Sequence, residues 1–123
     1  MYQLKDKVVI VTGAGGGLGK AFAKAFAGEG AKVAIADINE EGAQQTSKEI
    51  EGSIAIKVDV TSEASVKEMA EKVISQFGRI DVLINNAAIY AGIQRKPFFE
   101  LSENEWDLVM NVNLKGTWMA SKA

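Results

Sequence analysis

Hydrophobic positions along the chain fall into two alternating patterns. Four short apolar runs rich in β-branched residues, at 7–13, 32–37, 53–60 and 80–86, are typical of strands that are buried on both faces. Between these runs, apolar residues recur every three or four positions, which predicts amphipathic helices. Strands that alternate with helices indicate an α/β fold with a parallel sheet, right-handed crossovers and helices on both faces.

Local signals place the ends of the helices. The first helix is expected to bury an apolar stripe formed by Leu18, Ala21, Phe22, Ala25 and Phe26. Asn39 can cap a second helix, and Ser62 can cap a third helix that ends at Gly78. The third helix carries an apolar stripe of Val66, Met69, Ala70, Val73, Ile74 and Phe77. Ser102 and Glu105 form a capping box, so a long helical region is expected to begin at Ser102.

The order of the strands follows if the chain winds outward and then crosses back. Three strands wound outward, followed by a fourth on the other side of the first, give the order 3-2-1-4 in a Rossmann-like, doubly wound sheet. The crevice then lies between the first and fourth strands, at their carboxyl ends. We expect a ligand to bind there.

Composition narrows the possible functions. Hydrophobic residues make up 47% of the 123 residues and charged residues 24%, which is typical of a folded globular protein. The absence of cysteine and histidine excludes disulfides, a thiolate nucleophile, an imidazole base and a soft metal site, so we expect no bound metal. A net charge of -2 without charge blocks argues against nucleic acid or an anionic membrane as partner.

No apolar run approaches the roughly 18 residues of a membrane span, and the first residues lack the apolar centre of a signal peptide. We therefore expect a cytoplasmic protein with a small-molecule ligand.

A glycine-rich turn, "TGAGGGLG", joins the first strand to the first helix. Such a turn lets the backbone approach a pyrophosphate, and the helix offers free N–H groups there. The alternative is a tight turn that only needs flexible residues. Neither GxGxxG nor the phosphate loop GxxxxGK[ST] fits in any register. The pattern that does fit is TGxxxGxG, through Thr12, Gly13, Gly17 and Gly19.

Asp37 ends the second strand, 18 residues after Gly19. An acid at this offset accepts hydrogen bonds from a ribose and repels a 2′-phosphate, by about 4 kcal/mol for unit charges ~4 Å apart at an effective dielectric of ~20. No basic residue stands in the turn or beside Asp37 to offset this repulsion. The pattern favours NAD over NADP. The alternative is a strand-end aspartate that only accepts turn amides.

The turn, Asp37, the pair Asp59-Val60, "NNAA" at 85–88 and "NVNLKG" at 111–116 occur here in one order. Together they resemble the short-chain dehydrogenase/reductase family across essentially the whole chain. The resemblance implies NAD as cofactor and a set of binding residues: Gly13, Gly17, Leu18 and Gly19 in the turn, Asp37 at the adenosine ribose, Asp59 and Val60 at the adenine, and Asn86 and Ala87 beside the nicotinamide.

The asparagines and one alanine carry further implications of the resemblance. Asn113 matches the family asparagine that helps to hold a water in the proton relay, which makes it a catalytic residue, whereas Asn111 does not match. The family has glycine where this chain has Ala88, so an added methyl lies beside the expected cofactor path. For Asn85, a structural role and a ligand contact both stay open.

The family moves hydride between nicotinamide and an alcohol or carbonyl substrate, with a tyrosine as acid/base, a lysine four residues later and a serine. Residues 118–123, "WMASKA", imitate the family motif YxASKA with Trp118 in place of tyrosine. They follow Asn113 by only five residues, whereas the family motif comes several tens of residues later. We interpret them as part of the helix after Asn113. Tyr90 has no lysine four residues on and fits loop packing or the substrate rim.

These features predict that residues 1–123 form an incomplete NAD-binding domain, which ends inside the helix after Asn113 and is inactive alone. The expected partners are a small alcohol or carbonyl compound and, in the full-length form, further copies of the chain. One alternative is a non-catalytic nucleotide-binding or interaction module that functions at this length. Another is an S-adenosylmethionine-dependent methyltransferase, which also uses a glycine turn and a strand-end acid.

Overall fold

The computed structural model describes residues 3–89 and 95–123. Within them, one parallel sheet contains β1 (Val8–Thr12), β2 (Lys32–Asp37), β3 (Ile54–Lys57) and β4 (Val82–Ile84). Its order is β3-β2-β1-β4. The α-helices are α1 (Gly17–Gly28), α2 (Glu40–Lys48), α3 (Glu63–Phe77), α4 (Glu103–Met110) and α5 (Gly116–Lys122). The predicted α/β class and strand order are confirmed.

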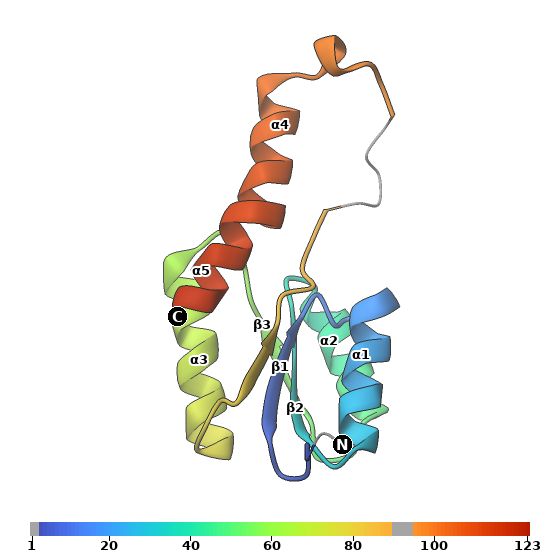
Figure 1. Ribbon diagram of the computed structural model, residues 1–123, viewed down its shortest axis with the longest axis vertical. Coiled ribbons are helices and arrows are strands. Elements are labelled where there is room, and N and C mark those ends of the chain that lie inside the picture. Colours follow the sequence, from blue (N-terminus) through green and yellow to red (C-terminus); the bar gives the residue numbers. More distant parts are fainter. Residues whose placement is uncertain (1–2, 90–94) are drawn as a thin grey trace.

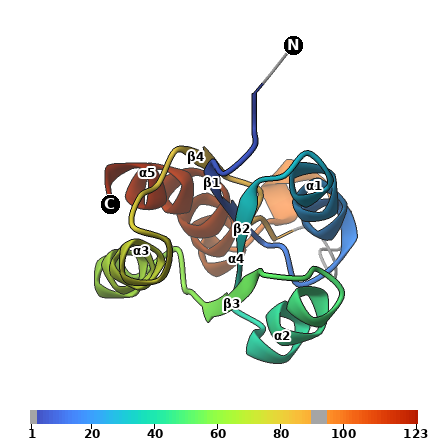
Figure 2. The same ribbon diagram turned by 90° about the horizontal axis from the view of Figure 1, so that it is seen from below.

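Helices cover both faces of the sheet. Figures 1 and 2 show α1 and α2 against one face and α3 and α5 against the other. Alternate residues of β1 point to the two layers: Val9 and Val11 pack in the core under α1 and α2, and Val8 and Ile10 pack in the core under α3 and α5. Continuous apolar runs are required because both faces of each strand are buried.

The predicted stripe of α1 is wrong except at Phe26, which is half-buried and packs against the core. Leu18, Ala21, Phe22 and Ala25 are exposed, and the helix instead buries Gly19 and Ala23 against the sheet. A Cβ on Gly19 would collide with the carbonyl oxygen of Gly13. The glycine turn therefore fixes the rotation of α1, and the residues that the helix buries fully are small ones. The predicted stripe of α3 is confirmed except at Ile74, which is exposed.

Two strands are shorter than predicted, and the residues missing from their carboxyl ends, 58–60 and 85–86, form loops. The predicted run 53–60 is paired only over Ile54–Lys57, and the run 80–86 only over Val82–Ile84. Beyond these strands, backbone amides bond to side chains: the N–H of Asp59 donates to Ser65 Oγ at 2.9 Å. The strands end where the chain turns to make these contacts.

The predicted caps are confirmed. Asn39 and Ser62 cap α2 and α3, Gly78 ends α3 in the left-handed conformation, and Ser102 and Glu105 form a complete capping box. From Ser102 the chain runs through α4, a π-helical turn η2 (Asn111–Lys115) and α5. A short 3-10 turn, η1 (Phe98–Glu100), precedes it.

The π-helical turn was not predicted from the sequence. Figure 1 shows α4 rising beyond the end of the sheet in line with α5. Over the described ranges, no helix combines the length and apolar character needed to cross a membrane.

Candidate cofactor site

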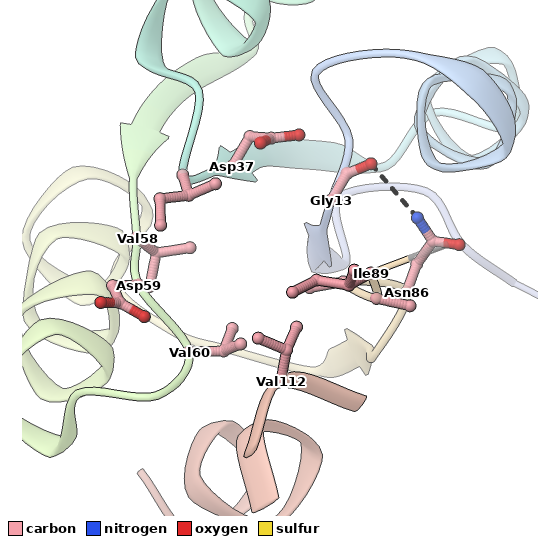
Figure 3. A pocket seen from close by; sticks show the side chains of 11 residues that line it. Gly13, Asp37, Val58, Asp59, Val60, Asn86, Ile89 and Val112 are labelled. Carbon is pink, nitrogen blue, oxygen red and sulfur yellow. Dashed lines mark hydrogen bonds between the residues drawn. The ribbon is translucent and has the colours of Figure 1, made fainter. Parts of the chain in front are cut away.

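A cavity of about 270 Å³ opens at the carboxyl ends of the strands. Its lining comes from the carboxyl ends of β1, β2, β3 and β4 and from η2, and Figure 3 shows these residues around the cavity. The residues that line it are Gly13, Asp37, Ile38, Val58, Asp59, Val60, Asn86, Ala87, Ala88, Ile89 and Val112. The cavity therefore lies at the carboxyl ends of the strands, where the strand order predicted a ligand.

Three glycines of the turn are required for different reasons. Gly13 has a φ of 67°, and a Cβ there would lie 2.9 Å from the Cα of Ala87. Gly17, the first residue of α1, has a φ of 55° and open space around it. A Cβ on Gly19 would meet both the Gly13 carbonyl and the Asn86 amide. Leu18 lies between them on the surface, 65% exposed.

Thr12 joins the turn to the segment after β4. Its side chain is buried, with 1% of the residue exposed. Oγ1 donates to the carbonyl of Ile84 at 3.3 Å and accepts the N–H groups of Asn86 at 3.1 Å and Ala87 at 3.0 Å. Asn86 adds a bond from Nδ2 to the Gly13 carbonyl at 3.2 Å, drawn in Figure 3. Thr12 belongs to the glycine-turn motif of the sequence, but the motif gives no sign of this link to the segment after β4.

Both carboxylate oxygens of Asp37 accept backbone amides. Oδ2 accepts the N–H of Gly15 at 2.8 Å, and Oδ1 accepts the N–H of Asn39 at 2.9 Å. Asp37 therefore makes the turn contacts that sequence analysis gave as its alternative role. A carboxylate has about four acceptor positions, so these two bonds leave capacity for a ligand.

The loop after β3 forms another wall of the cavity. Asp59 Oδ1 accepts the N–H and Oγ1–H of Thr61 at 2.9 and 2.6 Å. Val60 is buried beneath Gly116, where an added Cβ would lie 2.6 Å from Val60 Cγ2. The glycine of "NLKG" is therefore required because the helix packs closely on this loop.

Asn113 lies in η2 and pairs with the backbone of Ile89. Its Oδ1 accepts the N–H of Ile89 at 2.7 Å, and its Nδ2 donates to the carbonyl of Ile89 at 3.2 Å. Thr117 Oγ1 donates to the carbonyl of Asn113 at 3.2 Å. Asn111 is exposed. Turns of π-helix inside α-helices are frequent at functional sites.

The segment "TWMASKA" lies in α5, as the interpretation from spacing predicted. Met119 and Ala120 are buried against α3. Trp118 is 56% exposed, and Lys122 Nζ lies 4.6 Å from the centre of its ring. Ser121 Oγ accepts a bond from Asn85 Nδ2 at 3.0 Å, which gives Asn85 a structural role. None of these residues lines the cavity.

Apart from Val60, Ala87 and Ala88, the apolar lining was missed by the sequence analysis. Val58, Ile89 and Val112 lie around the cavity in Figure 3. Ile38 also lines it. Ile38 directly follows the strand-end Asp37 and is exposed. An isoleucine at this place in the sequence, directly after a buried strand, is the one signal that could have been noticed. Tyr90 lies outside the described residues.

Basic side chains are absent from the lining among the described residues. Lys20, which follows the glycine turn, pairs with Glu49 of the segment after α2 at 2.5 Å. The hydrogen bond from Lys20 lowers the pKa of Glu49. In residues 3–89 and 95–123 no three histidine, cysteine or carboxylate side chains gather as metal ligands.

Comparison with known proteins identifies a family. The sequence profile described as short chain dehydrogenase matches residues 7–123. The 3-oxoacyl-acyl-carrier-protein reductase FabG of Thermotoga maritima is 45% identical over 122 residues, which cover 94% of this chain and 48% of that protein.

Two solved structures are similar. The structure of a 3-ketoacyl-(acyl-carrier-protein) reductase from Brucella melitensis complexed with NADH has a TM-score of 0.92 and 37% identity, covering 97% of this chain and 49% of that one. A short chain dehydrogenase/reductase from Burkholderia phymatum in complex with NAD has a TM-score of 0.91 and 32% identity, covering 99% and 44%. The chain spans about half the length of these relatives.

Proposed function

Because this chain belongs to the short-chain dehydrogenase/reductase family of oxidoreductases, we propose that it is the NAD-binding part of an enzyme that transfers hydride between nicotinamide and an alcohol or carbonyl compound. The observation that carries the proposal is the cavity at the strand ends, with Asp37 at its rim and no basic side chain in its described lining. The NADH and NAD in the two similar structures support the choice of a nicotinamide cofactor.

The adenosine half of NAD fits the acidic side of this cavity. Asp37 would accept the hydroxyl groups of the adenosine ribose with the capacity that its amide contacts leave free. The adenine would lie between the loop of Asp59 and Val60 and the apolar side chain of Val112. Apolar walls with a few polar groups are typical of sites for flat organic ligands.

The pyrophosphate would pass over the glycine turn. Gly13, Gly17 and Gly19 bring the backbone close to this path, Leu18 exposes its side chain beside it, and α1 begins at Gly17 with free N–H groups. The N-cap residue of α1 makes no side-chain capping bond. An anion is the natural partner for such a helix end.

The nicotinamide would lie beside Asn86 and Ala87, near the segment that Asn113 holds. Asn113 is the proposed catalytic residue, since it would help to hold a water of the proton relay. Ala88 lies in the lining where the family pattern has glycine, so its methyl would border the cofactor. The reductases and the dehydrogenases among the relatives support an alcohol or carbonyl substrate.

We propose that residues 1–123 bind NAD without turnover. The chain contains no histidine or cysteine, and neither of its two tyrosines has a lysine four residues later. The proton needed at the substrate oxygen therefore has no tuned donor here.

Trp118 and Leu114 are exposed on the helix after Ser102, which supports contact with other copies in the complete protein.

Calorimetric titration of the chain with NAD, NADP and S-adenosylmethionine tests the proposal. NAD should bind more tightly than NADP, because the 2′-phosphate would approach Asp37 without a compensating base. S-adenosylmethionine should not compete with NAD. Tighter binding of NADP would reject the assignment of NAD, and binding of S-adenosylmethionine alone would favour the methyltransferase alternative.

A further inference from the structure

Gly15 lies in the middle of the glycine turn and contacts the carboxylate of Asp37. Its N–H donates to Asp37 Oδ2 at 2.8 Å. Its φ is not among the positive values found at Gly13 and Gly17, so its backbone conformation is open to other residues. The TGxxxGxG pattern leaves this position unspecified. A different reason must therefore account for a glycine here.

The space around Gly15 supplies that reason. A Cβ on Gly15 would lie 2.7 Å from Oδ2 and 3.0 Å from Cγ of Asp37, and 3.1 Å from the backbone carbon of Gly42. On the opposite side, a Cβ on Gly42 would lie 3.0 Å from the Gly15 carbonyl oxygen. The turn is thus in contact both with the carboxylate and with the first turn of α2.

The segment after β2 holds the other side of the carboxylate. The N–H of Asn39 donates to Asp37 Oδ1, and the side chain of Asn39 accepts the N–H of Gly42 at 3.1 Å. Asp37 is therefore fixed on both oxygens, by the glycine turn on one side and by the cap of α2 on the other. Any side chain at position 15 would have to displace it.

We propose that Gly15 is a positioning residue for cofactor selection, whose missing side chain lets Asp37 stand against the turn in the orientation that meets the adenosine ribose. The inference rests on the proposed function and adds a residue to it. It couples two features that the sequence presents as separate, the glycine turn and the strand-end acid. A variant with a side chain at position 15 would have to move the Asp37 carboxylate away from the turn.

The adjacent glycine offers a matched control. Gly16 has an extended backbone, with φ 177°, and an added Cβ would meet nothing within 4 Å. Gly15→Ala and Gly16→Ala thus make the same chemical change one residue apart. Asp37→Ala and the double variant Gly15→Ala/Asp37→Ala complete a cycle that measures the coupling. Each chain is titrated with NAD and with NADP by calorimetry.

Gly15→Ala should weaken NAD binding about tenfold, the size of one lost hydrogen bond to a charged group, and should lower the preference for NAD over NADP. Gly16→Ala should keep the wild-type preference for NAD over NADP, and Gly15→Ala should add little once Asp37 is alanine. Unchanged NAD affinity in Gly15→Ala overturns the inference, as does an equal loss with and without Asp37. If the wild-type chain binds neither nucleotide, the proposed function fails as well.

A second measurement needs neither nucleotide nor the Gly15 variant. The amide proton of Gly15 should exchange with solvent more slowly in the wild type than in Asp37→Ala, measured by nuclear magnetic resonance, because the carboxylate accepts it. The amide proton of Gly16 should exchange equally in both chains. Equal exchange at Gly15 in the two chains would overturn the inference even if NAD binds as proposed.

Discussion

Asp81 and Val8 are joined by two hydrogen bonds at the start of β4 and β1. Asp81 Oδ2 accepts the N–H of Val8 at 2.8 Å, and the N–H of Asp81 donates to the carbonyl of Val8 at 2.9 Å. The Val8 N–H, and after it Arg79, lowers the pKa of the Asp81 carboxyl. The carboxylate thus extends the pairing of β1 with β4 by one position.

This pairing predicts how stability depends on pH. A carboxyl whose pKa is lower in the folded state stabilises the fold above its unfolded pKa, about 3.9, and loses that contribution as the pH falls through the folded value. The free energy of unfolding should therefore fall in acid below about pH 4, and Asp81→Asn should flatten this part of the curve. Urea titrations from pH 2 to 7 measure it. Asp107→Asn, on the exposed side of α4, makes the same change in net charge and is the control. If Asp107→Asn flattened the curve of unfolding free energy against pH as much as Asp81→Asn, the prediction would be contradicted.

Thr12→Val should destabilise the protein by about 1–3 kcal/mol, because it removes the acceptor of the Ala87 N–H and one of the two acceptors of the Asn86 N–H. Thr12→Ser keeps the hydroxyl and loses one methyl, so it should cost less. Urea unfolding at pH 7 gives both values. If serine proves as costly as valine, packing of the methyl and not the hydroxyl links the turn to β4.

Asn113→Leu should expose the backbone of Ile89, since both side-chain bonds to it are lost. Each lost bond is worth about 1 kcal/mol. Hydrogen exchange at the Ile89 amide should accelerate, whereas exchange within β2 should change little. Asn111→Leu, two residues away and exposed, is the control. Unchanged exchange at Ile89 in Asn113→Leu would mean that the pairing contributes no protection.

Trp118→Tyr creates a tyrosine four residues before Lys122 but should not create an active enzyme. Position 118 is exposed on α5 and does not line the cavity. A proton donor there is too far from any bound carbonyl to act, because general acid catalysis needs about 3 Å. NADH oxidation at ~340 nm against a panel of ketones measures the activity. Turnover by the wild-type chain would contradict the proposed lack of activity. Turnover by Trp118→Tyr would contradict the interpretation of residues 118–123 as part of a helix and not as a catalytic motif.

Much of the fold could be predicted from the sequence because its signals are local. The β2 run matched its predicted bounds, and the caps at Asn39 and Ser62 were confirmed, since each depends on residues adjacent in the chain. The face of α1 could not be predicted in this way. Apolar spacing favoured Phe22, whereas the contact of Gly19 with the Gly13 carbonyl decided the rotation. That contact depends on how the turn closes in three dimensions.

The candidate site shows the same division. Gly13, Asp37 and Asn86 come from motifs, and the structure places all three around one cavity. Val112 was not found, because an apolar residue in a helix gives no signal of its own. Gly15 was missed for a related reason, since its requirement comes from a carboxylate 22 positions further along the chain.

The π-helical turn at Asn111–Lys115 has a consequence for changes in the length of the chain. A turn of this kind contains one residue more than an α-helical turn, and each residue of an α-helix turns it by about 100°. Removing one residue between 111 and 115 would restore a regular helix and rotate all that follows. Met119 and Ala120 would then leave the core beside α3, and Asn113 could no longer face Ile89 while they remained buried. Deletions of a single residue should therefore be tolerated less well here than at the exposed positions of α4.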